Sequence, residues 1–292
     1  MNPRARRGRD ARERATAALR ARGHEVIEVP RDSSAGALSR AITAHRDAVD
    51  VVLVGGGDGT LLRALPGLVE TGLPLAILPL GTFNELARTL GVPTKPEEVA
   101  ALIDEGVPLP VDVGRVNGVY YFNEASVGLS TRVTRLQTGA VKSRLGMLAI
   151  PVATLRALRW MRPLHLEITG DDGSRRVVRA VQLTVANSYR FGGVVENPEA
   201  SLEDGQVWLY AIDVRGPFNT LAILLAVALR RFPHAPNVLA LRGKRFVVRS
   251  VHGRRHRVFA DSEDVTRLPA EFTTVPAGAH VLVPSNRLPE IR

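Results

Sequence analysis

The chain has 292 residues, 45% of them hydrophobic and 23% charged, which is enough apolar material for a globular protein of two domains. Its 26 glycines and 19 prolines follow no period of three, which excludes a collagen-like chain. It has no cysteine, so disulfides, thiolate zinc sites and thiol nucleophiles are excluded, and a cytoplasmic protein is expected. The longest apolar run, Leu221–Leu229, is too short to span a bilayer, and no signal peptide is recognisable.

The charge is strongly positive, with 39 Lys and Arg against 29 Asp and Glu and a formal net charge of +10. Such a surface attracts polyanions, which include nucleic acids, anionic lipid headgroups and nucleotides. A general preference for arginine explains the excess equally well, because only Lys95, Lys142 and Lys244 are lysines. Composition alone leaves these explanations open.

The first 110 residues alternate between helical and strand patterns. The expected order is a helix over 5–22, a strand over Glu25–Val29, a helix over Ala35–His45, a strand over Val51–Val54, a helix over Thr60–Glu70, a strand over Leu75–Leu78 and a helix over Phe83–Leu90. Strands that alternate with helices in this way predict βαβ units and a parallel sheet. The sequence therefore predicts a Rossmann-like α/β domain over residues 1–111.

After Pro110 short alternating runs predict antiparallel strands, with turns between them. The runs are 120–123, 164–169, 177–185, 206–212, 245–250, 257–260 and 280–283. Helices are expected around Gly146–Met161 and Phe218–Phe232. Arg230 and Arg231 at the end of the second helix complement its dipole, and a membrane contact is the alternative explanation. A β-rich domain is thus expected over 112–283, with the tail 284–292 as a candidate to return to the first domain.

The strongest motif follows the apolar run 51–54 and consists of Gly55, Gly56, Gly57, Asp58, Gly59 and Thr60. Glycines at a strand end let backbone N–H groups approach a phosphate chain, and the N-terminus of the next helix favours anions. The motif lacks the lysine of a P-loop, and Asp58 makes it a poor dinucleotide fingerprint. An aspartate in this place suits Mg²⁺ or a ligand hydroxyl.

A second strand, Leu75–Leu78, runs into Gly81, Thr82 and Asn84 and another helix. Two strand–glycine–helix turns at one edge of a parallel sheet form a crevice in which ligands usually bind. Thr82 and Asn84 are candidates to hydrogen-bond a nucleotide, and each is equally a plausible helix cap.

The run GGGDGT followed by PLGTFNELAR resembles the catalytic domain of the diacylglycerol kinase and sphingosine kinase superfamily, in particular its bacterial lipid kinases. Further similarities are Asn123–Gly128, the K-x-x-L-G segment at Lys142–Gly146, Asn187 with Gly192 and Gly193, the P-x-A and DG elements at Pro198, Ala200 and Asp204-Gly205, and Asp261-Ser262-Glu263 in place of Asp-Gly-Glu. The resemblance extends over nearly the whole chain.

The resemblance implies a lipid kinase of the NAD-kinase/diacylglycerol-kinase-like fold, with a C-terminal antiparallel β-sandwich-like domain and ATP bound between the domains. The glycine loop would hold the phosphates together with Mg²⁺, and Asp58, Asp261 and Glu263 would be catalytic, Asp261 as the base. A structural metal would lie at Asp204, with Ser201 and Gln206 supplying backbone oxygens. The expected partners are ATP and a lipid such as diacylglycerol at the membrane surface, and an exposed edge strand is compatible with a homodimer.

Three departures from the family pattern stand out. Asn2-Pro3 is followed by Arg-Ala-Arg and not by the usual Ser-Gly, Leu62-Arg63 replaces Asn-Glu, and Ser262 replaces a glycine. A left-handed turn at Ser262 would be disfavoured by about 1 kcal/mol, because only glycine adopts that conformation freely.

Three alternatives remain at this point. GGDGTLLRA is closer to NAD kinases, so an NAD-kinase-like enzyme is the first. The second is a catalytically silent nucleotide or lipid sensor. The third and weakest is a nucleic-acid-binding protein, which is not expected because the chain has only 8 Phe, 2 Trp and 4 Tyr for base stacking.

Overall fold

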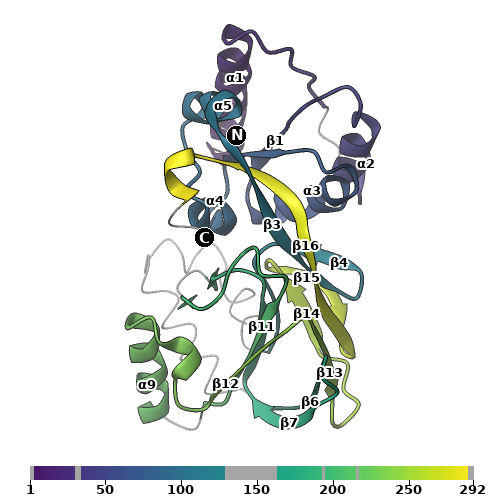
Figure 1. The fold of residues 1–292 in the computed structure, drawn as a ribbon, viewed down its shortest axis with the longest axis vertical. Coiled ribbons are helices and arrows are strands. Elements are labelled where there is room, and N and C mark those ends of the chain that lie inside the picture. The colour runs from purple at the N-terminus through teal and green to yellow at the C-terminus, as the bar shows by residue number, and fades with distance from the viewer. Residues whose placement is uncertain (1–2, 30–33, 129–162, 193–194, 215–216, 289–292) are drawn as a thin grey trace. The chain divides into compact units, whose positions relative to one another are not determined.

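The structure is a computed structural model that describes residues 3–29, 34–128, 163–192, 195–214 and 217–288 (Figure 1). The chain divides into two compact units. Unit 1 consists of Met1–Val113, Ser201–Glu203 and Pro276–Arg292, and unit 2 of Gly114–Ala200 and Asp204–Val275. The helix expected around Gly146–Met161 and the K-x-x-L-G segment lie outside the described residues.

Unit 1 is an α/β unit built on parallel strands. Its elements are α1 (Pro3–Ala21), α2 (Ala37–Ala44), β1 (Val52–Gly56), α3 (Asp58–Thr71), β2 (Leu75–Pro79), α4 (Glu85–Thr89), α5 (Pro96–Glu105), most of β3 (Val107–Val116), the end of β16 (Ala270–Val283) and the 3₁₀-helix η3 (Ser285–Arg287). β1 and β2 pair in parallel with Val52 opposite Leu75, and β16 adds a third parallel strand through Val281. The predicted parallel sheet is therefore confirmed.

Helices cover both faces of this sheet (Figure 1). On one face α1 packs with α5, where Ala15, Leu78 and Val99 form a buried cluster. On the other face α3 packs with α2 so closely that a Cβ on Gly67 would lie 2.7 Å from the backbone oxygen of Ser39. Glycine is thus required at this helix crossing.

The prediction of a strand over Glu25–Val29 is wrong, because residues 25–29 have no regular secondary structure. Ile27 and Val29 are 45% and 43% exposed, so the apolar side of the pattern is not buried against a core. Residues with alternating apolar side chains form a strand only where another strand supplies hydrogen-bond partners. None of the described strands does so here. The pattern did not reveal α5, although Pro96 at its first turn is a recognised start signal.

Unit 2 is made of antiparallel strands. Its elements are β4 (Val119–Tyr121), β5 (Glu124–Gly128), β6 (Leu164–Gly170), β7 (Arg175–Ala180), β8 (Gln182–Ala186), β9 (Arg190–Phe191), β10 (Val195–Glu196), β11 (Val207–Ile212), α9 (Pro217–Ala228), the 3₁₀-helix η2 (Phe232–His234), β12 (Val238–Gly243), β13 (Arg245–Ser250), β14 (Arg257–Ala260), β15 (Glu263–Arg267) and the start of β16. One sheet has the order β12-β11-β8-β5-β14-β15, and β16, β13, β6 and β7 are neighbours in a second sheet.

The single strand expected over Val177–Val185 is two strands in different sheets. β7 pairs with β6 in one sheet, whereas β8 lies between β5 and β11 in the other. The chain changes sheets at Val181, whose N–H donates to the Ile212 carbonyl at 2.7 Å. No glycine or proline marks this corner, so the apolar pattern concealed it.

One side of helix α9 packs against the rest of unit 2, where Ile223 joins a buried cluster with Phe191, Tyr210 and Phe232. The helix ends four residues earlier than the expected Phe232, and η2 follows it. In the part of the chain that the structure describes, no helix is long and apolar enough to span a membrane.

Candidate active site

Unit 1 brings the two glycine turns into direct contact. A Cβ on Gly57 would lie 2.9 Å from the Cα of Gly81, and a Cβ on Gly81 would lie 2.5 Å from the Cα of Gly57. A Cβ on Gly56 would overlap the side chain of Thr60. The turns meet because β1 and β2 are parallel neighbours in the sheet. The hydrogen bonding between them continues past the end of β2, where the N–H of Leu80 donates to the Gly56 carbonyl at 2.9 Å.

The side chain of Asn84 closes the second turn. Its Oδ1 accepts the N–H of Gly81 at 2.8 Å, and its Nδ2 donates to the Gly81 carbonyl at 3.1 Å. The residue adopts the left-handed conformation with φ 47°, which asparagine tolerates better than most residues. Asn84 therefore holds the turn, while Thr82 is exposed at its outer edge.

Asp58 links the two turns. Its Oδ1 accepts the backbone N–H of Glu85 at 2.7 Å, so this carboxylate from α3 caps the N-terminus of α4. The interaction fixes one oxygen of Asp58, and the other remains a candidate to face a cation. The side chain is half-buried, which keeps it in reach of a ligand.

The backbone N–H groups at the start of α3 divide into two kinds. The N–H of Thr60 donates to the Gly57 carbonyl at 2.8 Å, so it is used inside the turn. The N–H groups of Asp58 and Gly59 belong to the first helical turn, for which an α-helix supplies no partner. These donors, next to the exposed Gly55, suit an anion.

Leu62 and Arg63, which replace the Asn-Glu of the family pattern, lie in α3 and are not part of either glycine turn. Leu62 is 9% exposed and belongs to the core under α3, whereas Arg63 is exposed. An apolar side chain at position 62 stabilises the helix that carries Asp58.

In unit 2 the Asp261 carboxylate is buried and accepts three backbone N–H groups. Oδ2 accepts from Phe122 at 2.8 Å, and Oδ1 accepts from Asn123 at 3.0 Å and Glu124 at 3.1 Å. Its own N–H donates to the Glu124 carbonyl at 2.9 Å. Hydrogen bonds of this kind favour the ionised form of a carboxylate, and they hold both oxygens of Asp261 in place.

The two residues after Asp261 differ from it in exposure. Ser262 and Glu263 are both exposed, and Ser262 adopts the left-handed conformation with φ 73° that the missing glycine would take more easily. No hydrogen bond or ion pair of the Glu263 side chain is found among the described residues. Glu263 is therefore the more accessible carboxylate of the two.

A buried polar frame surrounds the segment that binds Asp261, and sequence reasoning did not assign it a role. Asn187 is 2% exposed; its Nδ2 donates to the Phe122 carbonyl at 3.2 Å and its N–H to the Asn123 carbonyl at 2.9 Å. Burial and the charge of Asp261 raise the pKa of Tyr121. Consecutive polar residues at 187 and 188, directly after the apolar strand β8, were the available signal.

The expected metal site at the 201–206 turn carries a competing cation. Oδ2 of Asp204 pairs with Arg242 at 3.0 Å, and Oδ1 accepts the N–H of Gln206 at 2.9 Å. The hydroxyl of Ser201 accepts the N–H of Glu203 at 3.1 Å. A metal ion would have to share the Asp204 carboxylate with this guanidinium group, and the metal site stays a prediction.

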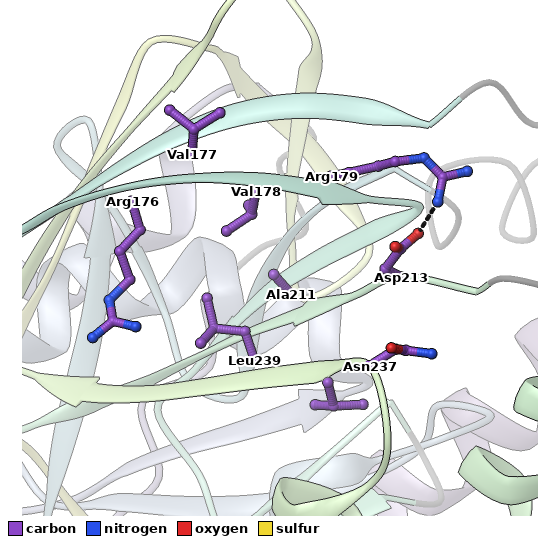
Figure 2. A pocket seen from close by; sticks show the side chains of 9 residues that line it. Arg176, Val177, Val178, Arg179, Ala211, Asp213, Asn237 and Leu239 are labelled. Carbon is purple, nitrogen blue, oxygen red and sulfur yellow. Dashed lines mark hydrogen bonds and ion pairs between the residues drawn. The ribbon is translucent and has the colours of Figure 1, made fainter.

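A hollow of about 590 Å³ in unit 2 contains none of the predicted site residues (Figure 2). β7, β11 and β12 supply its lining, with Arg176, Val178 and Leu239 around it. At one end Arg179 and Asp213 form an ion pair at 2.6 Å.

Family models match most of the chain. Residues 1–116 match the diacylglycerol kinase catalytic domain, and residues 123–283 match the YegS C-terminal NAD kinase beta sandwich-like domain. The chain belongs to the family of diacylglycerol kinases and YegS-like lipid kinases. Membership confirms the recognised resemblance and the expected fold class, and it identifies the chain as a phosphotransferase that acts on a hydroxyl acceptor.

Individual relatives support this assignment. The chain is 29% identical to a diacylglycerol kinase of Mycobacterium tuberculosis over 92% of its own length and 88% of the relative's. It is 31% identical to a probable lipid kinase YegS-like protein of Shewanella frigidimarina over 70% and 67%.

Solved structures share the fold at lower identity. A putative diacylglycerol kinase from Bacillus anthracis superposes with a TM-score of 0.77 at 23% identity, covering 93% of this chain and 90% of that one. An NAD kinase from Archaeoglobus fulgidus in complex with ATP gives a TM-score of 0.55 at 15% identity, covering 96% and 92%. These two likenesses concern the fold alone.

Proposed function

We propose that the protein is an ATP- and Mg²⁺-dependent lipid kinase that phosphorylates a hydroxyl of a membrane-derived lipid such as diacylglycerol. The contact between Gly57 and Gly81 is the observation that carries the nucleotide part of the proposal. The names of the relatives support the lipid part.

The paired turns of unit 1 are suited to the phosphates of ATP. The N–H groups of Asp58 and Gly59 start a helix, and the absence of side chains at Gly57 and Gly81 lets the second turn lie directly against the first. Phosphoryl transfer needs mainly positioning and neutralisation of charge, which such donors supply.

Asp58 would hold Mg²⁺ through the oxygen that does not cap α4. Hard oxygen ligands suit this ion, which usually takes one or two carboxylates and completes its shell with phosphate oxygens and water. When bound, the ion neutralises phosphate charge. The residue itself orients the second turn through Glu85, whether or not the ion is present.

The carboxylates of unit 2 would act on the acceptor hydroxyl. Glu263 is exposed and accessible, whereas Asp261 holds a fixed negative charge through three N–H donors. Asp261 remains the proposed base, and Glu263 is the second candidate to accept the hydroxyl proton.

The test is transfer of the γ-phosphate of radiolabelled ATP to a total lipid extract, with chromatographic identification of the labelled product. A parallel reaction contains NAD as the acceptor. A labelled phospholipid that requires Mg²⁺ is expected, and Asp58→Asn should lower its yield at least 100-fold. Label in NADP, or no labelled lipid, would contradict the proposal.

A further inference from the structure

Helix α9 presents a second apolar side that nothing in the described chain covers. Phe218, Leu225 and Leu229, in the helix and just after it, are 87%, 57% and 59% exposed. Their spacing of seven and four residues places them on one side of the helix. Ile223 on another side is buried in the core of unit 2.

The composition of α9 makes this exposure unusual. Residues 217–228 contain no charged side chain, and Asn219 and Thr220 are the only polar residues in the helix. A helix this rich in apolar residues is normally buried over most of its surface, and twelve residues are too few to cross a bilayer. Exposed apolar side chains that gather in one place mark an interaction surface.

The arginines next to the exposed apolar side of α9 indicate which partner covers it. Arg230 and Arg231 follow the helix, and both are exposed. Arg230 pairs with Glu196 at 2.9 Å, which leaves Arg231 as the cation for which no ion pair is found in the described part of the chain. The chain as a whole has a formal net charge of +10. An apolar surface with a positive margin complements an anionic lipid surface.

We infer that the outer side of α9, formed by Phe218, Leu225 and Leu229 with Arg231 at its end, docks the protein onto anionic membranes. The inference deepens the proposed lipid kinase function, on which it rests for the choice of a lipid surface. Docking would hold the protein at the bilayer in which its substrate resides.

The experiment measures sedimentation of the protein with vesicles of phosphatidylcholine alone and of phosphatidylcholine with 30% phosphatidylglycerol, a composition chosen as roughly that of an anionic leaflet. Wild type should bind the anionic vesicles and show little binding to the neutral ones. The double variant Leu225→Ser/Leu229→Ser should bind at least tenfold more weakly, because each leucine contributes apolar burial. Arg231→Ser, which leaves the apolar side intact, should lower affinity about fivefold.

Val177 provides the matched control, because it is an apolar side chain of unit 2 that is 68% exposed on β7 (Figure 2). Val177→Ser should bind vesicles like wild type. Equal binding of wild type and the double variant, or no binding of wild type to anionic vesicles, would overturn the inference. So would a wild-type dimer that the double variant dissociates, since a second copy would then cover this side.

Phosphorylation of dioctanoylglycerol in detergent micelles separates this inference from the proposed function. The double variant should keep wild-type activity in micelles and lose it on vesicles. A wild type that binds anionic vesicles through α9 but phosphorylates no lipid would contradict the kinase proposal and leave the docking inference intact.

Discussion

The glycine turns of unit 1 and the Asp261 turn of unit 2 use backbone N–H groups in opposite ways. In unit 1 the N–H groups of Asp58 and Gly59 have no helical partner and are available to a ligand. In unit 2 the N–H groups of Phe122, Asn123 and Glu124 are all directed at the protein's own carboxylate. The first arrangement attracts a negative charge, and the second already contains one.

This difference suggests a division of labour between the regions. Backbone donors at a helix start suit an anionic substrate, whereas a carboxylate held in place suits a proton or a hydroxyl. Substitutions in the two regions should therefore have different signatures in binding, stability and turnover.

The largest effect on nucleotide binding is expected for Gly81→Ala in unit 1. The new Cβ would lie 2.5 Å from both the Cα of Gly57 and the Oδ1 of Asn84, so the two turns would have to separate. We expect nucleotide binding to be lost and the free energy of unfolding to fall by about 1–3 kcal/mol. Equilibrium dialysis with radiolabelled ATP and urea unfolding measure the two quantities.

Gly8→Ala is the control for that substitution, because a Cβ there meets nothing within 4 Å and the residue lies inside α1. It should raise stability by up to about 1 kcal/mol through helix propensity. Unchanged ATP binding in Gly81→Ala would show that the contact between the turns has no functional role.

In unit 2 Asp261→Asn should lower both stability and turnover. The new amide places N–H groups opposite backbone N–H donors, which should cost about 2–4 kcal/mol of unfolding free energy. Glu263→Gln, at an exposed position, should lower kcat less than Asp261→Asn does and should leave the unfolding midpoint unchanged. The same loss of stability in both variants would contradict the distinction between a fixed and an accessible carboxylate.

Two substitutions of Asp58 distinguish its role in capping α4 from the role of its negative charge. Asp58→Asn keeps an oxygen for the N–H of Glu85, so stability should be retained while the Mg²⁺ concentration required for activity rises. Asp58→Ala also removes the cap and should cost about 1 kcal/mol more. Thermal unfolding and a Mg²⁺ titration of activity measure these effects, and equal stability of the two variants would exclude the capping role.

The smallest effect is expected for Ser262→Gly. Ser262 has φ 73°, and glycine adopts this conformation without the strain of a Cβ. The change should raise the free energy of unfolding by about 0.5–1 kcal/mol, measured by urea unfolding. Ser262→Ala should give no such gain, and a destabilised glycine variant would show that the serine side chain contributes more than the backbone strain removes.

Much of unit 1 was predictable because its signals are local. The apolar runs 51–54 and 75–78 end in glycines, and both become parallel strands whose turns touch. The expected strand over Glu25–Val29 failed because a strand depends on a partner that lies elsewhere in the chain.

Unit 2 was less predictable because its features depend on contacts distant in sequence. The change of sheet at Val181 and the hydrogen bonds from Phe122–Glu124 to Asp261 join residues that no short pattern relates. The motif at Asp261-Ser262-Glu263 indicated where acidic chemistry lies. Only the structure distinguishes the buried member from the exposed one.

The most direct test of these separate roles is titration calorimetry. The Mg²⁺ complex of a non-hydrolysable ATP analogue is titrated into wild type, Gly81→Ala and Glu263→Gln, and the three affinities are compared. The predicted result is that Gly81→Ala weakens binding at least tenfold, whereas Glu263→Gln binds the analogue like wild type but transfers phosphate to lipid more slowly. Full nucleotide affinity in Gly81→Ala, together with lost affinity in Glu263→Gln, would contradict the assignment of the phosphates to the glycine turns.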